Sequence, residues 1–198
     1  MRLFGCNLDC KFCDTKLNGF KQYQPQELLQ EIKTFRDKYH SVTFTGGEPL
    51  LQKDFLKEVL PLTRRAGFAN YLETNGTLPE ALKEIIEYVD IVAMDLKLPS
   101  STGLKPFWDA HREFLKISSE KEVFLKAVIC QSTQEQDLRQ AISIIKEINP
   151  AVVLVLQPDS SQDYRLIKEK IDTFSEICTE ENIVTCILPQ VHKLAGVK

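Results

Sequence analysis

The sequence predicts an α/β fold, an open and incomplete parallel (β/α) barrel, on three observations. Short runs rich in β-branched residues alternate with amphipathic helical patterns along the chain. The polar residues of these runs gather at their C-terminal ends, which share one face in a parallel sheet. The 198 residues suit one domain spanning 1–198, but a complete eightfold barrel typically takes about 250.

Six runs are expected to form strands, and Arg2, Leu3 and Phe4 are the stub of an earlier strand. These runs are residues 41–47, 70–76, 91–97, 122–130, 151–159 and 183–190. Helical spacing of apolar residues predicts helices over residues 25–40, 53–67, 78–89, 135–149 and 163–181. Their alternation implies parallel strands joined by right-handed crossovers.

Composition excludes several classes of protein. The net charge of −3 argues against direct nucleic-acid binding, which normally needs a basic surface. No apolar run reaches the roughly 20 residues of a membrane span, and no signal peptide is recognised. Six cysteines in this length do not form a disulfide scaffold, and Cys130, Cys178 and Cys186 are expected to be ordinary thiols. We therefore expect a cytoplasmic protein.

Polar residues at the strand ends predict one ligand site on that face. They form five groups, at residues 45–48, 73–76, 95–97, 157–158 and 190–193. A loop with three cysteines, Cys6, Cys10 and Cys13, follows the first strand and is expected to open onto the same face.

Three readings compete for this cysteine triad. A structural zinc site needs a fourth ligand, and the three histidines, His40, His111 and His192, all lie at non-standard spacings. A disulfide with one free thiol is unexpected in the cytoplasm. The remaining reading is a cubane iron–sulfur cluster held by three thiolates, which leaves one iron open to a small molecule.

The triad and a second motif resemble the radical S-adenosylmethionine (SAM) superfamily. The triad has the spacing Cys-x3-Cys-x2-Cys with Phe12 before its last cysteine, and "TGGEP" follows at residues 45–49. The resemblance implies a [4Fe-4S] cluster whose open iron chelates SAM and whose reduced form cleaves it to a 5′-deoxyadenosyl radical. The glycines are expected to let the backbone approach the methionine closely.

Within the superfamily the chain resembles the 7-carboxy-7-deazaguanine synthases over nearly its whole length. The matching segments are "RLFGCNLDCKFCDT", "TGGEPLLQ", "ETNGT", "MDLKLPSS", "LQPDS" and "PQVHK". The resemblance implies conversion of 6-carboxy-5,6,7,8-tetrahydropterin to 7-carboxy-7-deazaguanine with loss of ammonia, in queuosine biosynthesis. It also implies catalytic use of SAM, a requirement for Mg2+, a homodimer, and an electron donor such as flavodoxin or ferredoxin.

The resemblance also implies roles for individual residues. Cys6, Cys10 and Cys13 would bind the cluster, Thr15 would bind Mg2+, and Arg2 and Thr45 would meet the substrate. Glu48 would accept a hydrogen bond from the ammonium group of SAM. The residues expected around SAM are Phe12, Cys13, Asp14, Gly47, Glu48, Asp95, Leu96, Lys97, Gln157, Pro158, Asp159 and Ser160.

Several alternatives stay open at this point. Thr15 could be a loop or helix-cap residue, and Asp95 could form a plain ion pair with Lys97. The roles of Glu73, Asn75, Gln190, His192 and Lys193 are left undecided. The family usually has a longer segment before this arginine, with a first strand and a substrate-contacting loop, which this chain is expected to lack. A glycyl-radical-enzyme activase and an inactive iron–sulfur module are the rival functions.

Overall fold

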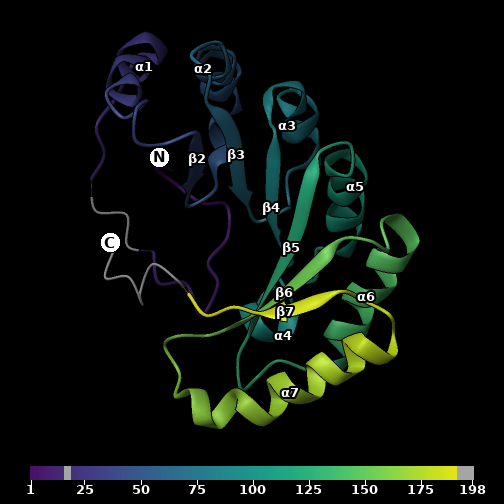
Figure 1. Ribbon diagram of the computed structural model, residues 1–198. Helices are drawn as coiled ribbons and strands as arrows, with labels where there is room; N and C mark the ends of the chain where they lie inside the picture. The colour runs from purple at the N-terminus through teal and green to yellow at the C-terminus, as the bar shows by residue number, and fades with distance from the viewer. Residues whose placement is uncertain (16–18, 191–198) are drawn as a thin grey trace.

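The computed structural model describes residues 1–15 and 19–190 (Figure 1). Seven strands form one sheet in the order β1-β2-β3-β4-β5-β6-β7, and every adjacent pair is parallel. The strands are β1 (Arg2–Leu3), β2 (Ser41–Gly46), β3 (Ala69–Thr74), β4 (Ile91–Asp95), β5 (Glu122–Ile129), β6 (Val153–Pro158) and β7 (Thr185–Ile187). The first and last strands do not pair, so the predicted open, incomplete barrel is confirmed.

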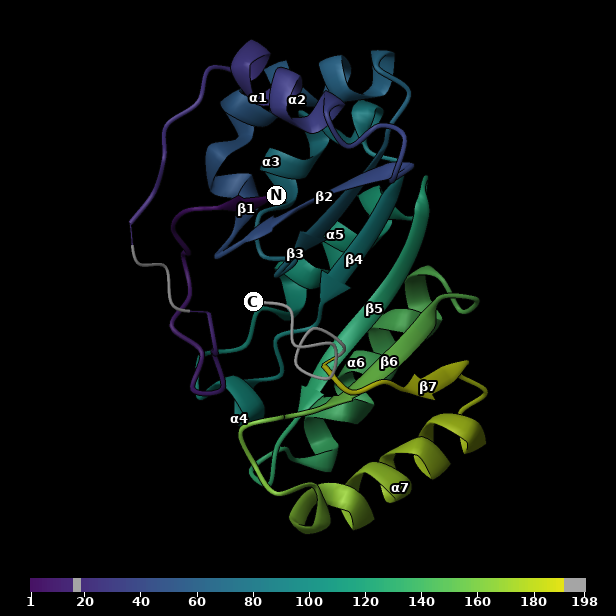
Figure 2. The ribbon, with the colours of Figure 1, turned by 60° about the vertical axis from the view of Figure 1, so that its left-hand side comes forward.

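Helices surround the outer side of this curved sheet (Figures 1 and 2). The α-helices are α1 (Pro25–Lys33), α2 (Lys53–Arg65), α3 (Pro79–Lys83), α4 (Pro99–Thr102), α5 (Trp108–Ser118), α6 (Glu135–Ile148) and α7 (Tyr164–Glu180). Two 3-10 turns, η1 (Pro49–Gln52) and η2 (Ile86–Tyr88), complete the set. Within the described ranges, no helix is both long and apolar enough to cross a membrane.

The core lies between the sheet and these helices. Phe44, Leu72, Met94 and Leu125, from four adjacent strands, are fully or almost fully buried. Because side chains alternate between the faces of a strand, the residue that follows each of them, such as Thr45 or Glu73, points to the inner face. Alternation therefore places the apolar residues against the helices and a row of polar residues on the inner face of the sheet.

Several helices differ from the sequence prediction. The pattern over residues 78–89 divides into α3 and η2, because the Ile85 backbone donates to the Leu82 carbonyl at 3.0 Å in a tighter turn that ends α3, and α4 was not predicted. Helix α1 ends at Lys33, not at residue 40, because Thr34 caps it and donates its hydroxyl to the Glu31 carbonyl at 2.7 Å. Phe35, which continues the apolar spacing of Leu28 and Ile32 in the predicted helix, follows α1 and is 51% exposed. Helix α5 was not among the predicted helices, although the buried residues His111, Phe114, Leu115 and Ser118 have helical spacing.

Candidate functional site

A cavity of about 600 Å3 opens on the inner face of the sheet, at the C-terminal ends of the strands. Its walls come from both ends of the chain, because the loop after β1 and residues 188–190 after β7 line it with β2 to β6 between them. Twelve predicted site residues line it, namely Arg2, Cys6, Cys10, Phe12, Cys13, Asp14, Thr15, Thr45, Gly47, Asp95, Lys97 and Gln157. Glu73, Asn75 and Gln190, whose roles were undecided, also line it.

The loop that carries the three thiols is fastened to the fold along its length. The Gly5 carbonyl accepts a hydrogen bond from the Glu48 backbone at 2.8 Å, and the Lys11 backbone donates to the Thr102 carbonyl at 3.0 Å. Between them, the Asn75 amide donates to the Asn7 side chain at 2.9 Å. The loop conformation is therefore set by β2, β3 and α4 together.

The two glycines of "TGGEP" are required by close packing within the protein. A Cβ atom on Gly47 would lie 2.1 Å from the Gly5 carbonyl oxygen, and one on Gly46 would lie 2.1 Å from the Leu3 carbonyl oxygen. Both distances are far inside van der Waals contact. The sequence interpretation assigned the glycines to approach of the cofactor, whereas the structure shows that they also let the cysteine-bearing segment pack on β2.

Glu48 lies behind the cavity wall. Its side chain is fully buried, and its carboxylate accepts hydrogen bonds from the Leu50 backbone at 3.0 Å, the Thr74 hydroxyl at 2.9 Å and the Asn75 backbone at 2.8 Å. Burial raises the pKa of Glu48 and these hydrogen bonds oppose the shift. These three donors hold the end of β3, and the expected hydrogen bond from the ammonium group of SAM to Glu48 stays a prediction.

Four other predicted cofactor residues do not line the cavity. Leu96 is buried in the core, and Pro158 is buried at the end of β6. The Asp159 carboxylate accepts from the Ser161 backbone at 2.9 Å, and the Ser160 hydroxyl donates to the side chain of Gln190. Alternation along the strand turns only Gln157 of this segment toward the cavity. His192 and Lys193 lie outside the described residues.

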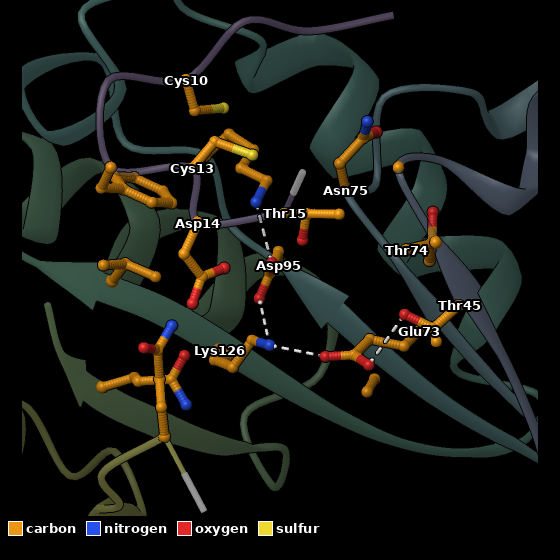
Figure 3. A pocket seen from close by; sticks show the side chains of 18 of the residues that line it. Cys10, Cys13, Asp14, Thr15, Thr45, Glu73, Thr74, Asn75, Asp95 and Lys126 are labelled. Atoms are coloured by element: carbon orange, nitrogen blue, oxygen red, sulfur yellow. Dashed lines mark hydrogen bonds and ion pairs between the residues drawn. The ribbon is translucent and has the colours of Figure 1, made fainter. Parts of the chain in front are cut away.

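A row of charged side chains crosses the cavity floor from β2 to β5 (Figure 3). The Thr45 hydroxyl donates to Glu73 at 3.0 Å, and Lys126 pairs with Glu73 at 2.8 Å and with Asp95 at 3.1 Å. Lys97 pairs with the other oxygen of Asp95 at 2.8 Å. The ion pair left open by the sequence therefore exists, but as one part of a longer chain that includes Lys126, which was not predicted.

The charges of this row support one another. Burial would raise the pKa of Asp95, but Lys126 and Lys97 outweigh it and lower that pKa. Burial would lower the pKa of Lys126, and the carboxylates of Asp95 and Glu73 reverse this and raise it. Asp95, Lys97 and Lys126 are thus held in their charged forms at neutral pH.

The donor set fits an iron–sulfur cluster. Cys6, Cys10 and Cys13 are free thiols on one wall of the cavity. Burial raises the pKa of Cys10, nearby Lys97 lowers it, and the neighbouring thiols raise it further. His111, which the zinc reading needed as a possible fourth ligand, is fully buried, and its Nε2 faces the Asn75 carbonyl at 3.3 Å.

The chain was compared with known proteins. The Radical SAM superfamily profile matches residues 2–129. A 7-carboxy-7-deazaguanine synthase from Geobacter sulfurreducens is 33% identical, over 99% of this chain and 88% of that protein. The chain belongs to the 7-carboxy-7-deazaguanine synthase family of radical SAM enzymes. Family membership implies a [4Fe-4S] cluster and SAM as cofactors.

Two further comparisons add breadth. The pyruvate formate-lyase-activating enzyme of Clostridium pasteurianum is 29% identical, over 78% of this chain and 71% of that protein. A structure of Streptococcus suis SuiB bound to S-adenosylmethionine superposes with a TM-score of 0.69 at 15% identity, over 93% of this chain and 48% of that one. The first similarity is less extensive than that to the synthase, and the second supports the fold.

Proposed function

We propose that this enzyme converts 6-carboxy-5,6,7,8-tetrahydropterin to 7-carboxy-7-deazaguanine with loss of ammonia, in queuosine biosynthesis. The observation that carries the proposal is the 33% identity to a synthase of that name over 99% of the chain. The cavity supports it, because its walls combine the thiol loop with polar groups from the six strands β1 to β6. A radical SAM enzyme acting as a carbon–nitrogen lyase on a polar, carboxylated ring would use both.

The three thiolates of Cys6, Cys10 and Cys13 would hold the cluster at the cavity wall. When bound and reduced, the cluster would supply the electron for the reductive cleavage of SAM. The backbone at Gly47 and the side chains of Asp95 and Lys97 would orient SAM. Five more residues on the cavity wall would surround it with them, namely Phe12, Cys13, Asp14, Asn75 and Gln157.

Arg2 would bind the carboxylate of the pterin, because a guanidinium donates two parallel hydrogen bonds to a carboxylate. Thr45 and Glu73 lie on the same cavity wall as Arg2 and would orient the pterin ring for hydrogen abstraction. Tyr71 and Phe124, whose ring centroids lie 6.1 Å apart, supply an apolar surface next to these groups.

Thr15 would contribute one oxygen ligand to Mg2+. The Arg2 guanidinium donates to the Thr15 hydroxyl at 3.3 Å, so the proposed metal ligand and the proposed carboxylate ligand are neighbours. Mg2+ prefers oxygen ligands and usually retains several waters. Thr15 and the carboxylate that Arg2 would bind are oxygen donors of the kind Mg2+ takes, and the metal would help to orient the substrate.

We propose the remaining partners on the resemblance alone. The enzyme would receive its electron from flavodoxin or ferredoxin and would act as a cytoplasmic homodimer. One fold unit would carry the whole reaction, since the cavity uses strands from β1 to β6 together with the segment that follows β7.

Anaerobic reconstitution tests the function. The protein is loaded with iron and sulfide, then incubated with the tetrahydropterin, SAM, reductant and Mg2+, and the product is measured by mass spectrometry. We expect 7-carboxy-7-deazaguanine to form with little accumulation of 5′-deoxyadenosine, because SAM is regenerated. Formation of 5′-deoxyadenosine without that product would contradict the proposal and favour an activase, which would act on a protein partner.

A further inference from the structure

We propose that Lys126 is a positioning residue that couples the cofactor side of the cavity to its substrate side, an inference that rests on the proposed function. Lys126 lies on β5 and lines the cavity between two carboxylates from neighbouring strands. None of the sequence motifs contains it.

Lys126 is the central link in a continuous chain of contacts across the cavity floor (Figure 3). Its ammonium lies 2.8 Å from an oxygen of Glu73 and 3.1 Å from an oxygen of Asp95. Beyond Glu73 the chain reaches the Thr45 hydroxyl at 3.0 Å, and beyond Asp95 it reaches Lys97 at 2.8 Å. The two ends are the groups assigned above to the substrate and to SAM.

Position along the sheet explains why one lysine can join both carboxylates. Asp95 and Lys126 are directly paired in the parallel register of β4 and β5, and the Leu96 backbone donates to the Lys126 carbonyl at 2.7 Å. The backbone is thus fixed by the sheet. Only the side chain crosses β4 to reach Glu73 on β3.

The contacts with Glu73 and Asp95 require a positive charge at position 126. The side chains of Lys126 and Asp95 are 16% and 17% exposed, so their attraction is screened less than at the surface. Without Lys126, Glu73 and Asp95 would be two like charges on one cavity floor, with Lys97 still paired to Asp95 and the Thr45 hydroxyl still donating to Glu73. Like charges repel in a poorly screened site, and the two carboxylates would move apart.

The consequence for the reaction is geometric. The carbon radical derived from SAM must meet one substrate hydrogen in a near-attack arrangement, and a displacement of about 1 Å can cost roughly a hundredfold in rate. A rigid row from Lys97 to Thr45 fixes the distance between the groups that hold the two molecules. Loss of Lys126 should therefore uncouple SAM cleavage from product formation.

The test compares Lys126→Met with Lys116→Met as a matched control. Lys116 also loses an ion pair, since it contacts Glu113 at 2.7 Å, but it lies on the surface of α5. The measurement is 5′-deoxyadenosine accumulated per 7-carboxy-7-deazaguanine formed. We expect this ratio to rise roughly ten- to a hundredfold in Lys126→Met and to stay at the wild-type value in Lys116→Met.

Lys126→Arg is the rescue variant, because arginine retains the charge and can donate to both carboxylates. Its ratio should stay within about threefold of wild type. If Lys126→Met fails to fold, Lys126→Gln, which retains a donor for one carboxylate, is expected to show the same rise. A wild-type ratio in the folded Met or Gln variant would overturn the role of Lys126.

A second measurement separates this inference from the proposed function. If the wild-type protein forms no 7-carboxy-7-deazaguanine, the proposed function fails, and Lys126 is then judged on SAM binding without pterin. Asp95 retains only Lys97 in Lys126→Met, so SAM affinity of the cluster-loaded protein should fall about three- to tenfold. Affinity equal to that of Lys116→Met would overturn the inference.

Discussion

Glu48, predicted to contact SAM, is also tied to neighbouring protein groups. Its carboxylate accepts three hydrogen bonds from Leu50, Thr74 and Asn75. Two of these donors lie at the end of β3, where Asn75 also reaches the thiol loop through Asn7. The structure therefore gives Glu48 a supporting role, and its direct contact with SAM stays a prediction.

Glu48→Gln separates support from direct contact. An amide nitrogen in place of the oxygen that Asn75 contacts would leave two donors facing each other, which costs roughly 1–3 kcal/mol of unfolding free energy. We expect the unfolding temperature of the protein to fall even without SAM. If Glu48 instead binds the ammonium group directly, SAM affinity should fall about ten- to a hundredfold with no change in unfolding temperature. Calorimetry and SAM titration distinguish the two.

Thr15 tests the proposed metal site. Thr15→Ala removes the hydroxyl that Arg2 contacts at 3.3 Å, and we expect the Mg2+ dependence of product formation to disappear while SAM cleavage persists. Thr15→Ser retains the hydroxyl and should retain much of the Mg2+ response. A wild-type Mg2+ response in Thr15→Ala would remove this residue from the metal site.

For individual residues, the sequence predicted which segments lie at the cavity better than which of their side chains point into it. The motif residues Cys6, Thr45 and Asp95 all line the cavity, as expected from their places at strand ends. Leu96 and Pro158 were included by adjacency, although alternation points them into the core. Lys126 was missed because it interrupts an otherwise apolar strand, and its partners are distant in sequence.

At the scale of elements, α5 carries a feature with a measurable consequence. His111 is fully buried against Asn75, and burial lowers the pKa of His111 to about 4. Between about pH 6.5 and 4, His111 therefore stays neutral in the folded protein, whereas it binds a proton in the unfolded chain, where its pKa is about 6.5. The helix should lose its packing on the site as pH falls.

His111→Gln provides the test of this pH dependence. In the wild-type protein, unfolding free energy should fall by up to about 1.4 kcal/mol per pH unit between about pH 6.5 and 4. Glutamine can still donate to the Asn75 carbonyl but does not titrate, so its stability curve should be flatter over that range. His40→Gln, at an exposed position, is the control. Parallel curves for wild type and His111→Gln would contradict the prediction.

The strands along the chain were predictable because each polar cluster followed an apolar run, but helix α5 and the ends of α1 and α3 were not. Helix α5 lacks a long apolar stretch, and its core face includes His111 and Ser118, which read as polar in sequence. Helix α1 stops at Lys33 because local capping by Thr34 wins over the continuing pattern that includes Phe35. Tertiary packing thus decided the first case and a local cap the second.

For the whole molecule, the open sheet leaves its first and last segments, the loop after β1 and the residues after β7, to be bridged by a bound ligand. The loop after β1 and residues 188–190 face one cavity, yet β1 and β7 do not pair with each other. A ligand held between them would supply contacts that the sheet lacks. Order of the strands along the chain could be predicted, but not how far the barrel closes, since that depends on contacts among residues far apart in sequence.

This arrangement predicts a large thermal shift that depends on the cluster. A ligand at about one hundred times its dissociation constant adds roughly 2.7 kcal/mol to the unfolding free energy. For a domain of this size, each kcal/mol raises the unfolding temperature by about 2–4 °C, so SAM should raise it by about 5–10 °C in the reconstituted enzyme. Cys13→Ala, treated in the same way, should show little shift because it lacks one thiolate. Anaerobic calorimetry measures the shift in both proteins. An equal shift would mean that SAM binds without the cluster-binding thiols and would contradict the prediction.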